Sequence, residues 1–289
     1  MLDKHSRRVY NNFNNKFYVR YVNMKLPVGL QLYTVRDEME KDFLGTLKAV
    51  REIGYEYVEL AGLHGYTPEE VKSMLEETGL KAMSAHVALG ELETDAVLDG
   101  YKTIGCDYIV IPYLAEGSRP GDDGFFPFMD QLRTIGQWCR DRGMTLLYHN
   151  HDFEYFVMPD GSFGLDYMYA NISPELLQTE LDLCWVKVAG QEPVEYLKKY
   201  ADRAPVVHFK DYIGEKSEGM YNLIGQKDTA KVTSTFAFRP VGEGCQDFPS
   251  IVKAVYETNA KYVVVEQDQT YDVPQLEAAK RGFDYLKTI

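Results

Sequence analysis

Four of the six histidines in this sequence stand at or just after the end of a short apolar run. Enzymes commonly gather metal ligands and acid-base groups at such places. A single histidine or acid there is more often a structural hydrogen-bonding group, so the chemistry depends on whether the fold brings several of them together. The polar residues at the ends of the runs are Gln31, Tyr33, Glu59, His86, Tyr113, His149, His151, Asp182, His208, Lys210 and Glu266.

The apolar runs belong to a repeated pattern of an amphipathic helix, a glycine or similar helix-ending residue, and a short strand. Apolar strands that alternate with helices predict a parallel sheet covered by helices, and eight such units close into a barrel. We therefore predict an α/β fold, a single-domain (β/α)8 TIM barrel over residues 24–289. An open doubly wound sheet is the alternative, although no GxGxxG follows the first strand. The strand-bearing segments are 28–33, 51–60, 76–86, 102–113, 140–150, 176–182, 205–211 and 257–268.

The last four strands of a closed barrel are neighbours whose carboxyl ends meet at the same mouth. This arrangement predicts that His149, Asp182, His208 and Glu266 come together. Two imidazoles and two carboxylates suit one divalent Mn, Zn, Co or Fe ion better than the all-oxygen sites of Mg or Ca. We expect one such ion at the mouth, with its identity open among these four metals.

The phrases that contain these residues resemble a known family. They are similar to the xylose-isomerase-like TIM-barrel superfamily of sugar-phosphate isomerases and epimerases, which also includes ketose 3-epimerases and inosose dehydratases. The resemblance covers essentially everything from Met24 on. It implies a metal quartet of Glu, Asp, His and Glu, in which Asp182, His208 and Glu266 take the last three positions. The phrases are YHNHDFEYF (148–156), LDLCW (181–185), VHFKD (207–211), VGEGCQDF (241–248) and VVVEQD (263–268).

The first position of this quartet departs from the family pattern. Where many relatives have a glutamate, this sequence has His149, with Glu154 a few residues beyond. Either His149 replaces the carboxylate or Glu154 reaches back to the metal. We favour His149, because a strand residue is held more rigidly than one in the following turn.

The resemblance implies an isomerase or epimerase of a sugar, keto-sugar or sugar phosphate that works through a metal-stabilised enediolate. Such enzymes use two acid-base groups, one on each face of the substrate. Glu266 would be one of them, and Glu154 or His149 the other. The alternative is a dehydratase or lyase that acts on an inosose or a 3-keto-glycoside, with His151 or His149 as the acid-base group. An apurinic endonuclease and a non-catalytic binding barrel are the remaining hypotheses.

Further residues near the mouth are candidates for substrate binding. Glu59 and His86 resemble positions where relatives bind substrate hydroxyls, and Tyr33 and Lys210 stand at strand ends beside them. The Gly242-Glu243-Gly244 turn could offer backbone N–H groups to a phosphate, and Arg239, which lies nearby in the sequence, is a candidate contact for the same group. The long connections at about 114–128 and 212–248 are expected to cover the mouth. The substrate-binding candidates are therefore Tyr33, Glu59, His86, Lys210 and Arg239.

The composition restricts the partners. Lys and Arg total 31 against 44 Asp and Glu, a net charge of −13, so the long-range field repels nucleic acid and argues against the endonuclease. The four cysteines have no CxxC spacing and predict reduced thiols in a cytoplasmic protein. We expect a small carbohydrate substrate, no nucleic-acid or membrane partner, and a homo-oligomer such as relatives form.

The first 23 residues differ from the rest of the chain. They are rich in Asn, Tyr and Arg and lack the apolar run of a signal peptide or membrane anchor. Because Met24 leads straight into the first barrel strand, we expect residues 1–23 to be a disordered extension upstream of the natural start.

Overall fold

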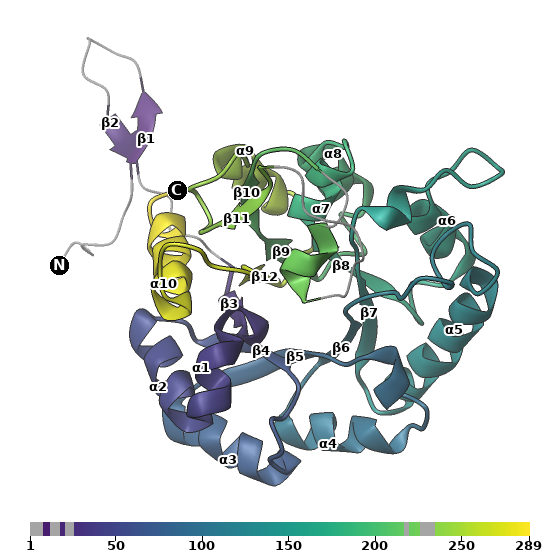
Figure 1. Cartoon of the computed structure of the whole chain (residues 1–289), viewed down its shortest axis with the longest axis horizontal. Helices are drawn as coiled ribbons and strands as arrows, with labels where there is room; N and C mark the ends of the chain where they lie inside the picture. The colour runs from purple at the N-terminus through teal and green to yellow at the C-terminus, as the bar shows by residue number, and fades with distance from the viewer. Residues whose placement is uncertain (1–7, 12–17, 21–25, 217–219, 226–234) are drawn as a thin grey trace.

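In the computed structural model, eight parallel strands close into a barrel that is surrounded by helices (Figure 1). The last strand, β12 (Tyr262–Val265), pairs with both β9 (Val206–Phe209) and β3 (Val28–Gln31), which closes the ring. The predicted single-domain (β/α)8 fold is confirmed. The barrel strands are β3 (Val28–Gln31), β4 (Tyr57–Ala61), β5 (Lys81–His86), β6 (Tyr108–Ile111), β7 (Thr145–His149), β8 (Gln178–Asp182), β9 (Val206–Phe209) and β12 (Tyr262–Val265).

The structure describes residues 8–11, 18–20, 26–216, 220–225 and 235–289. Within the segment that we expected to be disordered, β1 (Arg8–Asn11) pairs antiparallel with β2 (Tyr18–Arg20). The rest of that segment lies outside the described residues. In the part of the chain described here, no helix is both long enough and apolar enough to cross a membrane.

Both ends of α3 (Pro68–Thr78) follow from its sequence. At the start of α3, Thr67 and Glu70 cap each other's backbone N–H groups around Pro68, and Gly79 ends the helix with a left-handed φ of 71°. The helices are α1 (Arg36–Lys41), α2 (Phe43–Ile53), α3 (Pro68–Thr78), α4 (Ala96–Ile104), α5 (Phe125–Asp141), α6 (Gly164–Asn171), α7 (Leu183–Val188), α8 (Pro193–Lys199), α9 (Phe248–Val255) and α10 (Gln275–Leu286).

Side chains alternate along each barrel strand between the helix layer and the barrel axis. In β7, Leu146 and Tyr148 join the large core cluster beneath the helices, whereas Leu147 packs in a separate cluster on the axis. That axial cluster is an apolar floor formed by Met83, Val110, Leu147, Val206 and Val264. Two residues further along β7, β9 and β12, the same alternation directs His149, His208 and Glu266 into the barrel above this floor.

A bulge in β5 adjusts the alternation near the site. Val58 pairs with Ala82, but the next residue, Glu59, pairs with Ser84. Met83 is the extra residue, so it packs in the apolar floor while its neighbour Ser84 also faces the axis and donates a hydrogen bond to Glu59 (2.5 Å). The bulge therefore lets β5 contribute both to the floor and to the polar layer.

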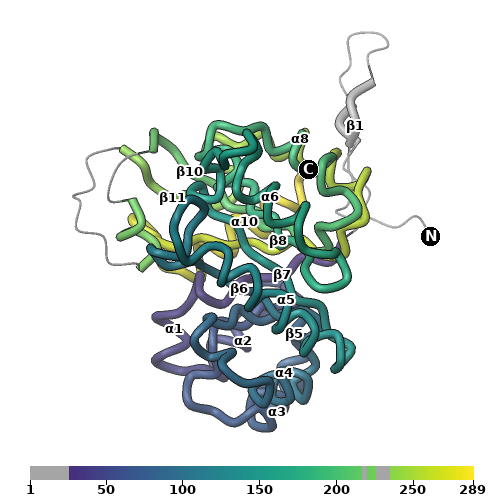
Figure 2. The backbone as a smooth tube through the Cα atoms, turned by 90° about the vertical axis from the view of Figure 1, so that its right-hand side faces the viewer, coloured from purple at the N-terminus to yellow at the C-terminus, as the bar shows by residue number. Residues whose placement is uncertain are grey.

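The longest connection follows β9 and has structure of its own. β10 (Asp211–Ile213) pairs antiparallel with β11 (Ala237–Arg239), and a short 3-10 helix, η4 (Met220–Ile224), lies between them in sequence. The side view places β10 and β11 toward one end of the barrel (Figure 2). Because β10 begins where β9 finishes, this is the end that carries the strand-end residues.

Candidate active site

The carboxyl ends of β7, β8, β9 and β12 bring together His149, Asp182, His208 and Glu266. One donor atom from each residue lies within 4.8 Å of the other three, and all four residues are buried. His149 Nε2 is 3.6 Å from Asp182 Oδ2, and His208 Nδ1 is 2.9 Å from Glu266 Oε2. The structure thus assembles the four residues that the strand ends pointed to.

These residues fit a divalent ion. Asp182 Oδ2 is fully buried without a hydrogen bond from the described residues, although the Lys210 ammonium lies 3.4 Å away. A buried carboxylate oxygen in that condition is costly unless a cation or donor satisfies it. Together with two imidazoles and a second carboxylate, it offers the mixed nitrogen and oxygen set that Mn, Zn, Co and Fe accept.

Two further carboxylates lie below the quartet. Glu59 Oε1 is 2.8 Å from His208 Nε2, and Glu180 Oε2 is 2.9 Å from His149 Nδ1. Both acids are completely buried. Sequence reasoning missed Glu180, but it stands two residues before Asp182 in β8, so the strand alternation places it on the same face.

Glu180 also belongs to a second set of close donor atoms, with His86, His149 and His208. Three imidazole nitrogens surround its Oε2 atom at 2.7, 2.9 and 3.1 Å. These are hydrogen-bond distances, which indicate an internal polar network at this depth. Burial and the nearby Glu59 raise the pKa of Glu180, whereas the histidines act in the opposite direction.

Glu154, the alternative fourth ligand, does not join the quartet. Its carboxyl accepts hydrogen bonds from the Tyr148 hydroxyl and from the His151 backbone N–H, the latter at 2.8 Å. Tyr148 belongs to the helix-facing side of β7, so Glu154 is directed away from the barrel axis. Burial raises the pKa of Glu154 to about 8.

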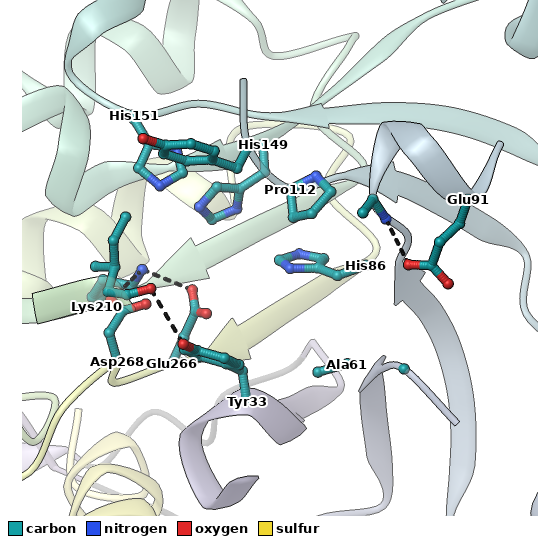
Figure 3. Close-up of a pocket in the computed structure, with 14 residues that line it drawn as sticks. Tyr33, Ala61, His86, Glu91, Pro112, His149, His151, Lys210, Glu266 and Asp268 are labelled. Carbon is teal, nitrogen blue, oxygen red and sulfur yellow. Dashed lines mark hydrogen bonds and ion pairs between the residues drawn. The ribbon is translucent and has the colours of Figure 1, made fainter. Parts of the chain in front are cut away.

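A cavity of about 300 Å³ lies beside the quartet (Figure 3). In Figure 3, His86, His149 and Glu266 converge on it from separate strands. The volume is at the lower end of the range for small-molecule sites and suits a ligand with a single ring. Its lining residues are Tyr33, Ala61, Gly62, His86, Ala88, Glu91, Pro112, Tyr113, His149, His151, Lys210, Ile224, Glu266 and Asp268.

Two of the expected substrate contacts do not line this cavity. Glu59 has no exposed surface because Gln31, Ser84 and His208 surround its carboxyl. It therefore supports the site from beneath. Arg239 donates to the Phe238 carbonyl and lies over a tyrosine ring outside the cavity.

The glycine turn that we considered for phosphate is already filled. The N–H groups of Gly242 and Gly244 donate to Asp211 Oδ2 at 3.0 and 2.8 Å. The N–H groups of Tyr212 and Gln246 donate to the other carboxyl oxygen of Asp211. The chain's own carboxylate thus occupies the place where an external anion would bind.

Lys210 is the central cation of the cavity wall. Its ammonium is 2.9 Å from Glu266, 2.8 Å from Asp268 and 3.4 Å from Asp182. Burial alone would lower the pKa of Lys210, but these carboxylates raise it well above its usual value. Burial raises the pKa of Asp268 to about 6, against the opposing effect of Lys210. Asp268, two residues after Glu266, lines the cavity and was also missed by sequence reasoning.

The two histidines that flank the quartet differ in charge. Burial would lower the pKa of His86, but Glu59 and Glu180 raise it to about 10. Burial, assisted by Lys210, lowers the pKa of His151 well below its usual value. His151 Nδ1 is buried and has no hydrogen-bond partner among the described residues. The two shifts thus favour the protonated form of His86 and the neutral form of His151.

The connection after β9 reaches over the cavity. The Tyr33 hydroxyl donates to the Ile224 carbonyl at 3.2 Å, and Tyr33 stands in a short 3-10 helix just after β3 rather than on the strand itself. The Tyr221 hydroxyl and the Lys216 ammonium both contact the buried carboxyl of Asp152. These contacts attach the connection to the loops that follow β3 and β7, which agrees with the expectation that it covers the mouth.

Comparison with known proteins identifies a family to which the chain is similar and several related enzymes. A family model described as xylose isomerase-like TIM barrel matches residues 47–289. The inosose dehydratase of Geobacillus kaustophilus is 23% identical over 87% of this chain and 85% of its own length. The inosose dehydratase of Clostridium botulinum (strain Alaska E43 / Type E3) is 30% identical over 54% of this chain, and the match spans about half of that protein.

Solved structures agree in fold. A sugar phosphate isomerase/epimerase from Parabacteroides distasonis is similar with a TM-score of 0.74 and 20% identity, over 91% of this chain and 96% of that one. A probable 3-DHS dehydratase from Bacillus anthracis is similar with a TM-score of 0.65 and 16% identity, over 90% of this chain and 99% of that one. At these identities the similarity concerns the barrel architecture alone.

Proposed function

Because this chain belongs to the xylose isomerase-like TIM-barrel family, we propose that it is a divalent-metal-dependent lyase that removes water from a cyclic keto-polyol of the inosose class. One observation carries the proposal. A buried imidazole, His151, lines the cavity beside the candidate ligands with its Nδ1 free of hydrogen bonds from the described residues, whereas the Glu154 carboxyl is held by Tyr148. The Geobacillus relative, which is named inosose dehydratase and matches most of the chain, supports the same reaction class.

The proposed ligands are His149, Asp182, His208 and Glu266, whose donor atoms share one small volume. A divalent ion bound there would supply Lewis-acid chemistry, polarising a substrate carbonyl and stabilising the negative charge that develops on its oxygen. The cavity beside these ligands holds one ring, which agrees with a cyclic keto-polyol.

His151 is the proposed base. Its imidazole removes the proton from the carbon next to the carbonyl, and the C–H electron pair forms the enolate. When the carbonyl re-forms, the C–O bond breaks at the hydroxyl-bearing carbon on the far side of the carbon that lost its proton. Lys210 Nζ, held by Asp268 at 2.8 Å, donates the proton with which that hydroxyl leaves as water. Solvent then returns the proton from His151 to the lysine, so that the enzyme is restored.

Elimination suits these residues better than epimerisation. An epimerase that exchanges a proton between two faces of a carbon needs an acid-base group on each face. The second group expected from the sequence was His149 or Glu154. His149 belongs to the candidate ligand set, and the Glu154 carboxyl is engaged by Tyr148 and the His151 backbone. The lyase hypothesis is therefore the one that we carry forward.

The cavity also favours an unphosphorylated substrate. Among its described lining residues, Glu91, Glu266 and Asp268 are acidic, and the ammonium of Lys210 is already shared by carboxylates. The turn at Gly242 and Gly244 gives its N–H groups to Asp211. Both cationic side chains of the described lining, Lys210 and His86, are thus already paired with carboxylates of the chain and are not free to pair with a phosphate.

A product assay tests the proposal. The protein, loaded in turn with Mn²⁺, Co²⁺ and Zn²⁺, is incubated in D2O with inososes, 3-keto-glycosides and simple ketoses. We expect loss of one water from an inosose, seen by mass spectrometry and as ultraviolet absorbance of the unsaturated ketone. Deuterium incorporation and an epimeric product without water loss would instead establish an isomerase. The complete absence of both reactions would refute either assignment.

A further inference from the structure

We propose that Glu180 is a positioning residue that sets the ring orientation of both candidate histidine ligands, His149 and His208. It would do so by accepting hydrogen bonds from the ring nitrogens that face away from the quartet. This inference rests on the metal site of the proposed function. It concerns a residue that is neither in the quartet nor on the cavity wall, and that reaches the reaction only through the two histidines.

The geometry converges on one oxygen atom. Glu180 Oε2 lies 2.9 Å from His149 Nδ1 and 3.1 Å from His208 Nε2. The other carboxyl oxygen, Oε1, has no hydrogen-bond partner among the described residues. A single carboxylate oxygen therefore makes the contacts to both rings, and a small movement of Glu180 would disturb both ligands together.

These contacts decide which nitrogen of each imidazole is available to bind a metal ion. In the proposed arrangement Glu180 is the acceptor of both contacts, which places the His149 proton on Nδ1. Its Nε2 lone pair then faces Asp182 Oδ2 at 3.6 Å. For His208, Nε2 is the nitrogen held by Glu180 and Glu59, which leaves Nδ1 toward Glu266. Hydrogen bonds of this type from a second layer of residues orient metal-binding imidazoles in proteins.

His86 makes the burial of Glu180 tolerable. A carboxylate without exposed surface is costly unless a cation pairs with it, and His86 Nε2 lies 2.7 Å from Glu180 Oε2. The same imidazole nitrogen is 3.1 Å from Glu59 Oε1. His86 thus stands between the two buried acids, each of which holds a candidate ligand. This explains why the barrel interior keeps charged groups so close to its apolar floor.

Two variants test the role of Glu180. Glu180→Leu removes the acceptor, while Glu180→Gln keeps the size and one acceptor oxygen. Calorimetric titration with Mn²⁺ and with Zn²⁺ should show about 10- to 100-fold weaker binding for Glu180→Leu and a smaller loss for Glu180→Gln. In the metal-free protein, ¹⁵N NMR of the imidazoles should place the His149 proton on Nδ1 in the wild type and show that this preference is lost in Glu180→Leu.

The matched control is Leu147→Ala. Leu147 is fully buried in the apolar floor, two residues before His149 on the same strand. This change should lower the melting temperature and leave the Mn²⁺ affinity and the His149 proton position unchanged, which separates positioning from general destabilisation. If Glu180→Leu does not fold, Glu180→Gln is judged by the same two measurements.

Unchanged metal affinity in a folded Glu180 variant, or a wild-type His149 that carries its proton on Nε2, would overturn the inference. If the wild-type protein binds no divalent ion, the proposed function fails. The metal-free NMR measurement then decides the role of Glu180 by itself, because it reports the hydrogen bond directly.

Discussion

His208 Nδ1 lies 2.9 Å from Glu266 Oε2, although the two residues are 58 positions apart in the sequence. The contact forms because β9 and β12 are paired neighbours in the barrel, with His208 opposite Val264 and Glu266 two residues further along. Both side chains are buried and both point toward His149 and Asp182. The relationship brings two candidate ligands from distant segments to one place, and the first two predictions depend on it.

Divalent metal should stabilise the folded protein. An ion that binds only the folded state adds about 2.7 kcal/mol to the free energy of unfolding at roughly 100 times its Kd. We expect Mn²⁺ or Zn²⁺ to raise the melting temperature of the wild type and EDTA to reverse the shift. His208→Ala should lose this response, while His64→Ala, a change at an exposed histidine, should keep it. A metal response that survives in His208→Ala would count against the site.

The fourth ligand can be identified by comparing two variants. His149→Ala removes a member of the quartet, whereas Glu154→Gln changes a carboxyl that contacts Tyr148 instead. We expect Mn²⁺ affinity to fall by at least about 100-fold in His149→Ala and to stay near the wild-type value in Glu154→Gln. Calorimetric titration measures both. The reverse result would identify Glu154, and not His149, as the fourth ligand.

His151 should affect turnover more than metal binding. Loss of a general base lowers the rate by about 10²- to 10⁴-fold. In His151→Gln we therefore expect kcat for water elimination to fall by such a factor, with the Mn²⁺ affinity retained because His151 is outside the quartet. Steady-state kinetics on an inosose, together with a Mn²⁺ titration of the same preparation, provide the check. A variant with normal kcat would exclude His151 as the base.

The free energy of unfolding should decrease as the pH rises, because of Glu154. Burial raises its pKa to about 8 from the ordinary value of 4.5, so between these pH values the folded protein binds a proton that the unfolded chain has released. This contribution to the free energy of unfolding is fully present below pH 4.5 and is lost as the pH rises through about 8. The slope from one such group is at most about 1.4 kcal/mol per pH unit.

Glu154→Gln removes this titrating group. Urea unfolding of both proteins across the same pH range gives their free energies of unfolding. As the pH falls, the wild type should gain stability relative to the variant. Parallel pH dependences for the two proteins would show that Glu154 does not carry the raised pKa. The variant also serves the ligand test above, so both measurements can be made on one preparation.

The sequence by itself determined the barrel and most of the quartet. The repeated units of helix, breaker and strand indicate the number of strands. The chain order then places β7, β8, β9 and β12 side by side in the closed ring. Alternation along a strand then predicts that Asp182, His208 and Glu266 face the axis, whereas the sequence left the fourth ligand open between His149 and Glu154. These inferences need only the periodicity of side chains and the order of the strands.

Only the tertiary structure decided which polar groups are already satisfied by the chain itself. Glu59 and Glu180 face the same axis as the quartet but end beneath it, because the register between neighbouring strands sets the height of each side chain. Glu154 turns to Tyr148, and Asp211 fills the turn at Gly242. Such outcomes depend on distances of a few ångströms between segments that are far apart in sequence, and side-chain periodicity carries no information about those distances.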